Sequence, residues 1–224
     1  MKQYRISELN LEIKTNSETL KKNLAPYETQ FDYKPNLSIS ITEDLLAQYA
    51  EEYGDYTLDE IENIYISTEF ARSLFDFNGF AMQCTAVEHN GYAVLFASPV
   101  DNINLYEYLP KDKVFCIDYP AIRLIHTTFF AYDTPFGLNG DKAKSNRLPI
   151  KSIVFVDSER FSDLAIVDTK DMVYMFIRAV TASLHSDRTK HTLFMLEKLK
   201  HKVSFYGVKD LSDAYNILEA IDNE

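Results

Sequence analysis

The chain has 224 residues, of which 46% are hydrophobic and 25% are charged, with 6 Gly and 7 Pro. This composition is typical of a globular protein of one large domain, or one and a half, and it excludes a disordered or low-complexity chain. The net charge is −11, from 23 basic and 34 acidic residues. Because a nucleic-acid binder needs basic side chains to neutralise phosphates, that class of protein is excluded.

The negative charge is concentrated in the N-terminal half. Residues 1–112 contain 8 basic and 19 acidic residues, whereas residues 113–224 contain 15 of each. No Lys or Arg occurs between residues 35 and 71, and nine acids fall within residues 43–69. These acids form either the solvated side of two helices or a docking surface for a basic peptide or protein partner.

The sequence shows no sign of a membrane or a metal. Its N-terminal residues lack the apolar core of a signal peptide, and no apolar run reaches the ~18 residues that a membrane span needs. Cys84 and Cys116 lie in apolar, strand-like runs without the spacing of metal ligands, which indicates buried reduced thiols. We therefore expect a cytoplasmic protein.

The first third of the chain predicts short strands followed by helices. Residues 4–13 and 37–41 are strand-like runs separated by polar turns. Thr42, followed by two acids, predicts the start of a helix, and Gly54 predicts the residue just beyond its end.

A second helical region follows. Thr57 and Glu60 have the spacing of a capping box, although the apolar pattern of residues 61–66 leaves helix and strand unresolved. Ser67 predicts the start of another helix, which Gly79 would close.

The remaining chain predicts mostly strands, then mostly helices. Asn90-Gly91, between the apolar runs 80–87 and 92–97, is a strong hairpin signal. Asp168 predicts a helix N-terminus, with Met172 and Met175 facing inward as core residues. Further strands are expected at residues 114–117, 121–125, 129–132, 150–156 and 203–208, and further helices at 187–199 and 211–221. This order predicts an α+β fold with a mixed sheet.

The common catalytic motifs are absent. The sequence contains no GxGxxG, GxxxxGK[ST], HExxH or GxSxG, and its five histidines are scattered. One loop stands out, because residues 98–104 follow the predicted strand 92–97 and lead into the amphiphilic segment 105–109. Strand, loop and helix in this order is the setting of a phosphate-binding loop.

From about Phe80 to the C-terminus, the sequence resembles the HPr kinase-like family. The matching blocks occur in the family's order and spacing: CTAV (84–87), GYAVLF (91–96), SP (98–99), DYPAIR (118–123), YDTPF (132–136), LPIKSIVF (148–155) and VSFY (203–206). The resemblance implies a phosphoenolpyruvate carboxykinase-type fold in residues 80–224, preceded by an acidic α/β region, residues 1–79, packed on or continuous with that core. It also implies a bacterial protein related to small kinases of peptide-modification cassettes.

The departures from the family fall on the residues that carry its chemistry. The positions of the phosphate-binding loop are occupied by Ser98, Pro99, Asp101, Asn102, Ile103, Asn104 and Leu105. The lysine, the glycines and the hydroxyl ligand for Mg²⁺ are therefore missing, and Asp101 adds a negative charge. In addition, Gln83 replaces the family's histidine, Ile117 its first aspartate and Phe136 its tryptophan. Losing a positioned base alone typically lowers a rate by ~10²–10⁴-fold.

We therefore expect a non-catalytic kinase relative that binds a peptide or protein partner, with no cofactor, no metal and no catalytic residue. Gln83, Asp118, Arg123 and Asp133 remain as residues of a vestigial pocket. The first alternative is an enzyme with a rebuilt site that uses Asp118 and nearby carboxylates, or a residual kinase. The second is a structural or regulatory subunit whose first 80 residues form the interaction surface.

Overall fold

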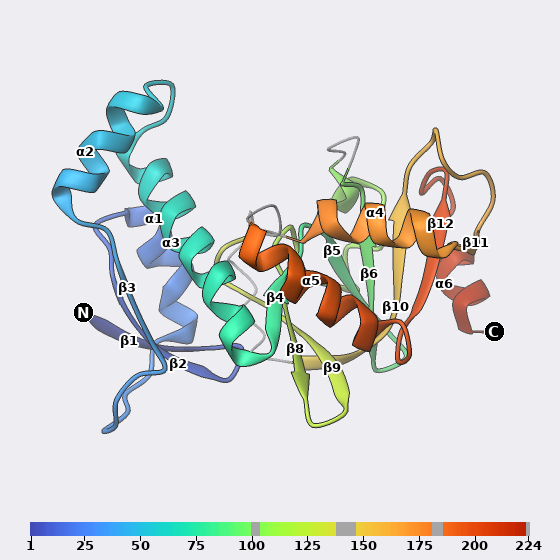
Figure 1. The fold of residues 1–224 in the computed structure, drawn as a ribbon, viewed down its shortest axis with the longest axis horizontal. Coiled ribbons are helices and arrows are strands. Elements are labelled where there is room, and N and C mark those ends of the chain that lie inside the picture. The colour runs from blue at the N-terminus through green and yellow to red at the C-terminus, as the bar shows by residue number, and fades with distance from the viewer. Residues whose placement is uncertain (100–103, 138–146, 181–185, 223–224) are drawn as a thin grey trace.

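The computed structural model describes residues 1–99, 104–137, 147–180 and 186–222, with the side chains of residues 186 and 187 left out. Figure 1 shows a smaller N-terminal part on the left, beside a larger part built on a sheet. Within the described residues, no helix is both long and apolar enough to cross a membrane.

The N-terminal part is built on a three-stranded sheet. Strands β1 (Lys2–Ile6) and β2 (Leu9–Lys14) form a hairpin, and β3 (Leu37–Ser40) pairs in parallel with β2. The hairpin turn consists of Ser7 and Glu8, which have φ values of 52° and 61°. Two successive residues in the left-handed region are typical of a type I′ turn, although Asn and Gly are its usual residues. Helix α1 (Glu18–Leu24) and the short helix η1 (Ala25–Tyr27) follow β2.

Two longer helices complete this part, α2 (Glu43–Glu52) and α3 (Leu58–Leu74). The predicted caps are confirmed, since Thr42 accepts the Leu45 N–H and Thr57 forms a capping box with Glu60. The prediction that Ser67 starts a separate helix was wrong, because α3 is continuous through it. The buried Ser67 hydroxyl instead donates to the Ile64 carbonyl at 2.9 Å, a contact that allows serine inside a helix.

Gly79 does not close a helix as predicted. The short helix η2 (Phe75–Phe77) follows α3, and Asn78 takes the left-handed conformation, with φ 54°. Gly79 then begins strand β4 (Gly79–Ala81). A Cβ atom on Gly79 would lie 2.6 Å from the Ile122 carbonyl oxygen, so glycine is needed for a close backbone approach.

The larger part contains a curled, mixed sheet. Its main strand order is β4-β8-β9-β10-β6-β5-β7, with β12 joined to β10 and β11 to β12. Strand β10 is parallel to β6 and β12, and the other pairs of this sheet are antiparallel. The additional bounds are β5 (Thr85–His89), β6 (Tyr92–Ala97), β7 (Val114–Cys116), β8 (Ala121–Ile125), β9 (Thr128–Tyr132), β10 (Arg147–Val156), β11 (Ala165–Ile166) and β12 (Ser204–Val208).

The predicted hairpin is confirmed, since β5 and β6 are antiparallel neighbours joined by Asn90 (φ 51°) and Gly91 (φ 80°). The apolar run 80–87 is not one strand, however. Its first part is β4, which pairs with β8, and its second part is β5, which pairs with β6. The apolar run gave no sign that the chain changes its partner strand between β4 and β5.

Helices cover both faces of this sheet. On one face lie α4 (Thr169–Ala179), whose predicted cap Asp168 accepts the Asp171 N–H, and α5 (Ser186–Leu199) (Figure 1). Ile153 and Phe155 of β10 are buried in the cluster that contains Met175 and Leu199. The alternating residues of β10 instead share a cluster with α6 (Ala214–Asp222), on the opposite face. The predicted α+β class, with a mixed sheet and flanking helices, is thus confirmed.

A third cluster joins the two parts. It contains Ile6 and Leu11 of the N-terminal sheet and Phe70 of α3, together with Ala121 and Phe136 of the larger part. The Phe70 and Phe136 rings lie 4.9 Å apart between centroids. The apolar face of the N-terminal sheet is therefore covered partly by residues that come more than a hundred positions later.

Gly79 provides a test of the contact between β4 and β8. We expect Gly79→Ala to lower the free energy of unfolding by about 2 kcal/mol, because the new methyl group would overlap the Ile122 carbonyl and the Arg123 side chain. Gly54→Ala is the control, since its Cβ would come no nearer than 4.0 Å to the Ala50 carbonyl oxygen. Urea denaturation measures both changes, and equal stabilities would contradict the close approach.

Candidate functional site

The segment in the position of the family's phosphate-binding loop ends in the hydrophobic core. Strand β6 leads to the buried Ser98, and the chain re-enters the described residues at Asn104. The predicted helix over residues 105–109 was wrong in kind, because only a short 3₁₀ helix, η3 (Leu105–Glu107), forms there. Asp101, Asn102 and Ile103 lie outside the described residues.

Leu105 is only 5% exposed and belongs to the cluster beneath α6. Asn104 is exposed, and its amide donates to the Glu107 carboxylate at 3.2 Å. A phosphate would need backbone N–H groups at the start of a longer helix, together with a cation. Neither requirement is met by the described residues of this segment.

Asp118 lies in a tight turn that other residues hold in place. Its φ is 67°, and the Tyr119 N–H donates across it to the Ile117 carbonyl at 2.9 Å, which defines a γ-turn. The Thr134 hydroxyl donates to the Tyr119 carbonyl at 2.6 Å, and a Cβ on Gly137 would lie 2.0 Å from the Ile117 carbonyl oxygen. Burial raises the pKa of Asp118 above its ordinary range. The DYPAIR and YDTPF blocks are thus in direct contact.

Arg123 joins the two parts of the molecule. Its Nη1 donates to the Ser7 carbonyl at 2.6 Å, and its Nε donates to the Phe77 carbonyl at 3.4 Å. The guanidinium therefore holds the tip of the β1–β2 hairpin beside the end of η2. Gln83 occupies a different place, since its side chain is exposed and its N–H donates to the Ala179 carbonyl at 2.7 Å, at the end of α4.

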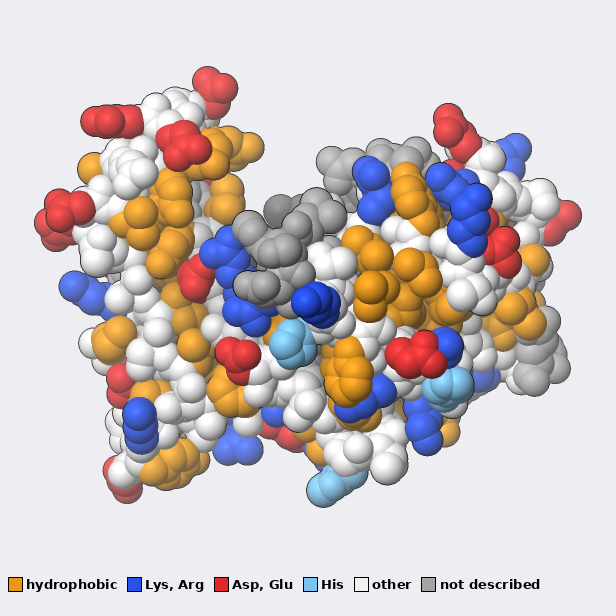
Figure 2. Space-filling model, viewed as in Figure 1, with side chains coloured by type: hydrophobic (Ala, Val, Ile, Leu, Met, Phe, Trp, Pro, Cys, Tyr) orange, Lys and Arg blue, Asp and Glu red, His pale blue; other side chains and the backbone are white. Residues whose placement is uncertain are grey.

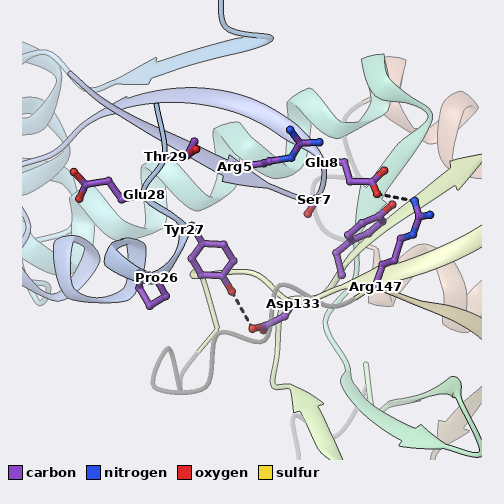
Figure 3. Close-up of a pocket in the computed structure, with 10 residues that line it drawn as sticks. Arg5, Ser7, Glu8, Pro26, Tyr27, Glu28, Thr29, Asp133 and Arg147 are labelled. Atoms are coloured by element: carbon purple, nitrogen blue, oxygen red, sulfur yellow. Dashed lines mark hydrogen bonds and ion pairs between the residues drawn. The ribbon is translucent and has the colours of Figure 1, made fainter. Parts of the chain in front are cut away.

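Asp133 lines a polar pocket of about 580 Å³ between the two parts (Figure 3). Residues from the β1–β2 hairpin and η1 form one side, and residues at the end of β9 and the start of β10 form the other. The lining residues include Arg5, Ser7, Glu8, Tyr27, Tyr132 and Arg147. Of the four vestigial-pocket residues expected from the sequence, Asp133 lines the pocket directly. Arg123 binds the backbone of the lining residue Ser7, whereas Asp118 and Gln83 are not lining residues.

The Asp133 carboxyl group is held by three donors, the Tyr27 hydroxyl, the Cys116 thiol and the Thr134 N–H. The Tyr27 hydroxyl donates to its Oδ2 at 2.9 Å (Figure 3), and the Cys116 thiol also donates to it. Burial raises the pKa of Asp133 to about 6, although these three hydrogen bonds act in the opposite direction. Burial likewise raises the pKa of Tyr27 and of Cys116, so both remain protonated donors at neutral pH. Asp133 can therefore gain or lose a proton near neutral pH.

The other side of the pocket carries polar groups of both signs. The Glu8 carboxylate accepts from Arg147 Nη1 at 2.6 Å (Figure 3). The Ser7 hydroxyl oxygen is buried without a hydrogen-bond partner among the described residues, whereas the Tyr132 hydroxyl interacts with Arg147 and Glu8. Buried polar atoms without partners are uncommon, and they often contact water or a ligand. The pocket can thus receive a small polar molecule, although it carries acids as well as arginines.

Three or more His, Cys, Asp or Glu side chains suited to a metal ion do not come together anywhere in the part of the chain that the structure describes. In the comparisons with known proteins, no family model matches the chain and no curated protein matches it. The resemblance to the HPr kinase-like family therefore rests on the sequence blocks quoted above.

Most of the pocket was not predictable from the sequence. Arg5, Tyr27 and Arg147 have no motif around them. The packing of the N-terminal part brings Arg5 and Tyr27 to Asp133, and the pairing of β10 with β9 brings Arg147 there. The one available signal was the family block that contains Asp133. Sequence reasoning could name this residue but not its partners.

The Arg123 contacts provide a test of how the N-terminal part is held. We expect Arg123→Met to lower the free energy of unfolding by about 2 kcal/mol, because two backbone carbonyls would lose a charged donor. Arg147→Met is the matched comparison, since it removes the partly exposed ion pair with Glu8 and the contact with the Phe130 ring, and should cost less. Urea denaturation of both variants tests this order, and the reverse order would contradict it.

The raised pKa of Asp133 predicts how stability changes with pH. Between its ordinary pKa of 3.8 and about 6, the folded state keeps a proton that the unfolded state has lost, so the Asp133 contribution to stability falls as pH rises. Asp133→Asn cannot ionise and should lack this loss. Its stability relative to the unmodified chain should therefore increase by about 2–3 kcal/mol across this interval.

The measurement is urea denaturation of both proteins at several values between about pH 4 and pH 7. Asp112→Asn, which changes an exposed side chain, serves as the control. A constant difference between Asp133→Asn and the unmodified chain over this range would show that Asp133 titrates normally.

Proposed function

We propose that this protein is a non-catalytic relative of the HPr kinase-like family, with a phosphoenolpyruvate carboxykinase-like core, and that it acts by binding a peptide or protein partner. The observation that carries the proposal is the position of Leu105. At the place where the family presents a hydroxyl to Mg²⁺, this chain buries a leucine beneath α6.

Restoring a nucleotide site would require a rearrangement of this region. Moving Leu105 out of the core costs about 1.5–3 kcal/mol of hydrophobic burial, before any phosphate is bound. Asn104 carries no charge, and its amide already binds Glu107. The free energy of binding would also lack the lysine contact, a charged hydrogen bond of ~1.5–3 kcal/mol.

The contacts of the retained family residues support the same proposal. Arg123 is engaged by two backbone carbonyls, and the Thr134 hydroxyl holds the turn at Asp118. Each of these residues thus has a structural contact that explains its presence without a nucleotide. A scaffold that keeps its packing and loses its phosphate site is suited to recognition rather than to phosphoryl transfer.

A second candidate function is an enzyme with a rebuilt site centred on Asp133. The observation that favours it is a carboxyl group with a pKa of about 6 on the wall of a 580 Å³ pocket, within reach of Tyr27. Such a group is suited to general acid or base catalysis near neutral pH. Asp118 does not line this pocket, so an enzyme with this site would rely on Asp133 and the lining arginines.

Calorimetric titration with Mg-ATP tests the leading proposal. We expect no binding heat up to about 1 mM nucleotide, because neither a helix start nor a cation is available beside β6 in the described residues. The titration uses the full chain at high concentration, with Mg-ADP run in parallel. Sub-millimolar binding of either nucleotide would refute the proposal that the phosphate-binding site has been lost. That result would not depend on whether the protein binds a partner.

A further inference from the structure

Helix α2 has an apolar face that the described part of the chain leaves largely uncovered. None of its residues is buried, and Leu45, Leu46 and Tyr49 are only half-buried. In Figure 1, α2 lies at the outer edge of the N-terminal part, beside α3. A helix held on one side only leaves part of its apolar face available to a partner.

A groove of about 390 Å³ lies between these two helices. Its lining consists of Tyr49, Tyr53, Tyr56, Ile61, Ile64 and Tyr65, with Thr68, Glu69 and Arg72 completing the wall. Tyr53, Ile64 and Tyr56 are 48%, 51% and 52% exposed, respectively. The Tyr49 ring lies 6.1 Å from both the Tyr53 and the Tyr65 rings, so three aromatic side chains form a continuous wall.

The groove lies in the most acidic region of the protein. Several of the nine acids in residues 43–69 have structural contacts, such as Glu62, which accepts the N–H groups of Asn16 and Ser17. The acids Glu43, Asp44, Glu51, Glu52 and Asp55 are all exposed. The one cation in the lining, Arg72, is paired with Glu69. Figure 2 shows hydrophobic side chains over α2 and α3, with acidic side chains around them.

We propose that the α2–α3 groove binds a basic segment of a partner protein, in which Lys or Arg side chains flank an aromatic or aliphatic anchor. This inference rests on the proposed partner-binding function and names the class of partner. The tyrosine faces attract cationic side chains, and Ile61 and Ile64 contact the apolar anchor. The surrounding carboxylates complement the positive charge of the segment and speed its association.

Tyrosine is well suited to such a surface. It provides a large, rigid contact area at a low cost in conformational entropy, and its hydroxyl remains at the solvent edge. The volume of the groove matches one or two side chains rather than a whole folded domain, so a short peptide segment is the appropriate ligand.

The test uses the full chain and three fluorescent peptides of equal length. The first alternates Lys and Arg with Phe and Leu, the second has Glu and Asp in place of the basic residues, and the third has Gly and Ser in place of the apolar residues. Fluorescence anisotropy should show binding of the first peptide, which weakens at least tenfold between about 50 and 300 mM salt. Equal binding of the acidic peptide, or of the peptide without anchors, would overturn the proposal.

Matched variants locate the site. We expect the double variant Tyr53→Ala/Tyr56→Ala to weaken binding of the basic peptide at least about tenfold, because both rings are exposed wall residues. Tyr215→Ala is the control, since Tyr215 is 55% exposed on α6, at the other end of the molecule (Figure 1). Equal losses in the two proteins, or no loss in either, would overturn the assignment to the groove.

A second pair of variants separates local from overall charge. The groove variant combines Glu51→Gln, Glu52→Gln and Asp55→Asn, and the control combines Glu88→Gln, Asp112→Asn and Asp163→Asn, all at exposed positions. Both variants remove three negative charges, but only the groove variant should weaken binding of the basic peptide at low salt. Equal effects would show that the peptide responds to net charge alone and would overturn the proposal.

Two further outcomes are distinguishable. If sedimentation shows that the chain dimerises, and Tyr53→Ala/Tyr56→Ala abolishes the dimer, a second copy occupies the groove and the proposal fails. If the basic peptide does not bind and Mg-ATP does not bind either, the groove assignment fails while the non-catalytic proposal stands. If both Mg-ATP and the basic peptide bind, the groove assignment stands, and the proposal that the phosphate-binding site has been lost fails.

Discussion

One guanidinium adds a polar link to the hydrophobic cluster that joins the two parts. Arg123 projects from β8 and donates to two backbone carbonyls, one at the tip of the N-terminal hairpin and one beside the start of β4. A half-buried arginine is stable as a cation only when its N–H groups are hydrogen-bonded. Backbone carbonyls in turn need donors wherever they are shielded from water. This contact helps to hold Ser7, which lines the polar pocket together with Asp133.

The segments that resemble the HPr kinase-like family make packing contacts throughout this structure. Leu105 takes a core position, and Gly137 permits a backbone contact that any side chain would block. The polar pocket combines Tyr132 and Asp133 of one such segment with residues of the N-terminal part, and it shares no residue with the aromatic groove. Substitutions in the pocket and in the groove can therefore be made independently of each other.

Local signals predicted local structure well. The Asn90-Gly91 turn, the caps at Thr42 and Asp168 and the capping box at Thr57 were all identifiable, because each depends on neighbours a few residues away. The continuous α3 helix was missed, since Ser67 fits a helix interior as well as a helix start. The Ser7-Glu8 turn carries no glycine or asparagine to reveal it, and the pocket depends on contacts such as Tyr27 with Asp133, 106 positions apart.

The order in which the chain is synthesised gives this architecture a particular consequence. The N-terminal sheet appears first, but its apolar face is completed by Ala121, Tyr132 and Phe136. The contacts of its hairpin tip with Arg123 and Arg147 also form only after those residues are synthesised, and Arg147 pairs with Glu8 across 139 positions. On the ribosome, the first third therefore leaves apolar surface exposed until most of the larger sheet has emerged, and the acidic residues around α2 help to keep that early chain in solution.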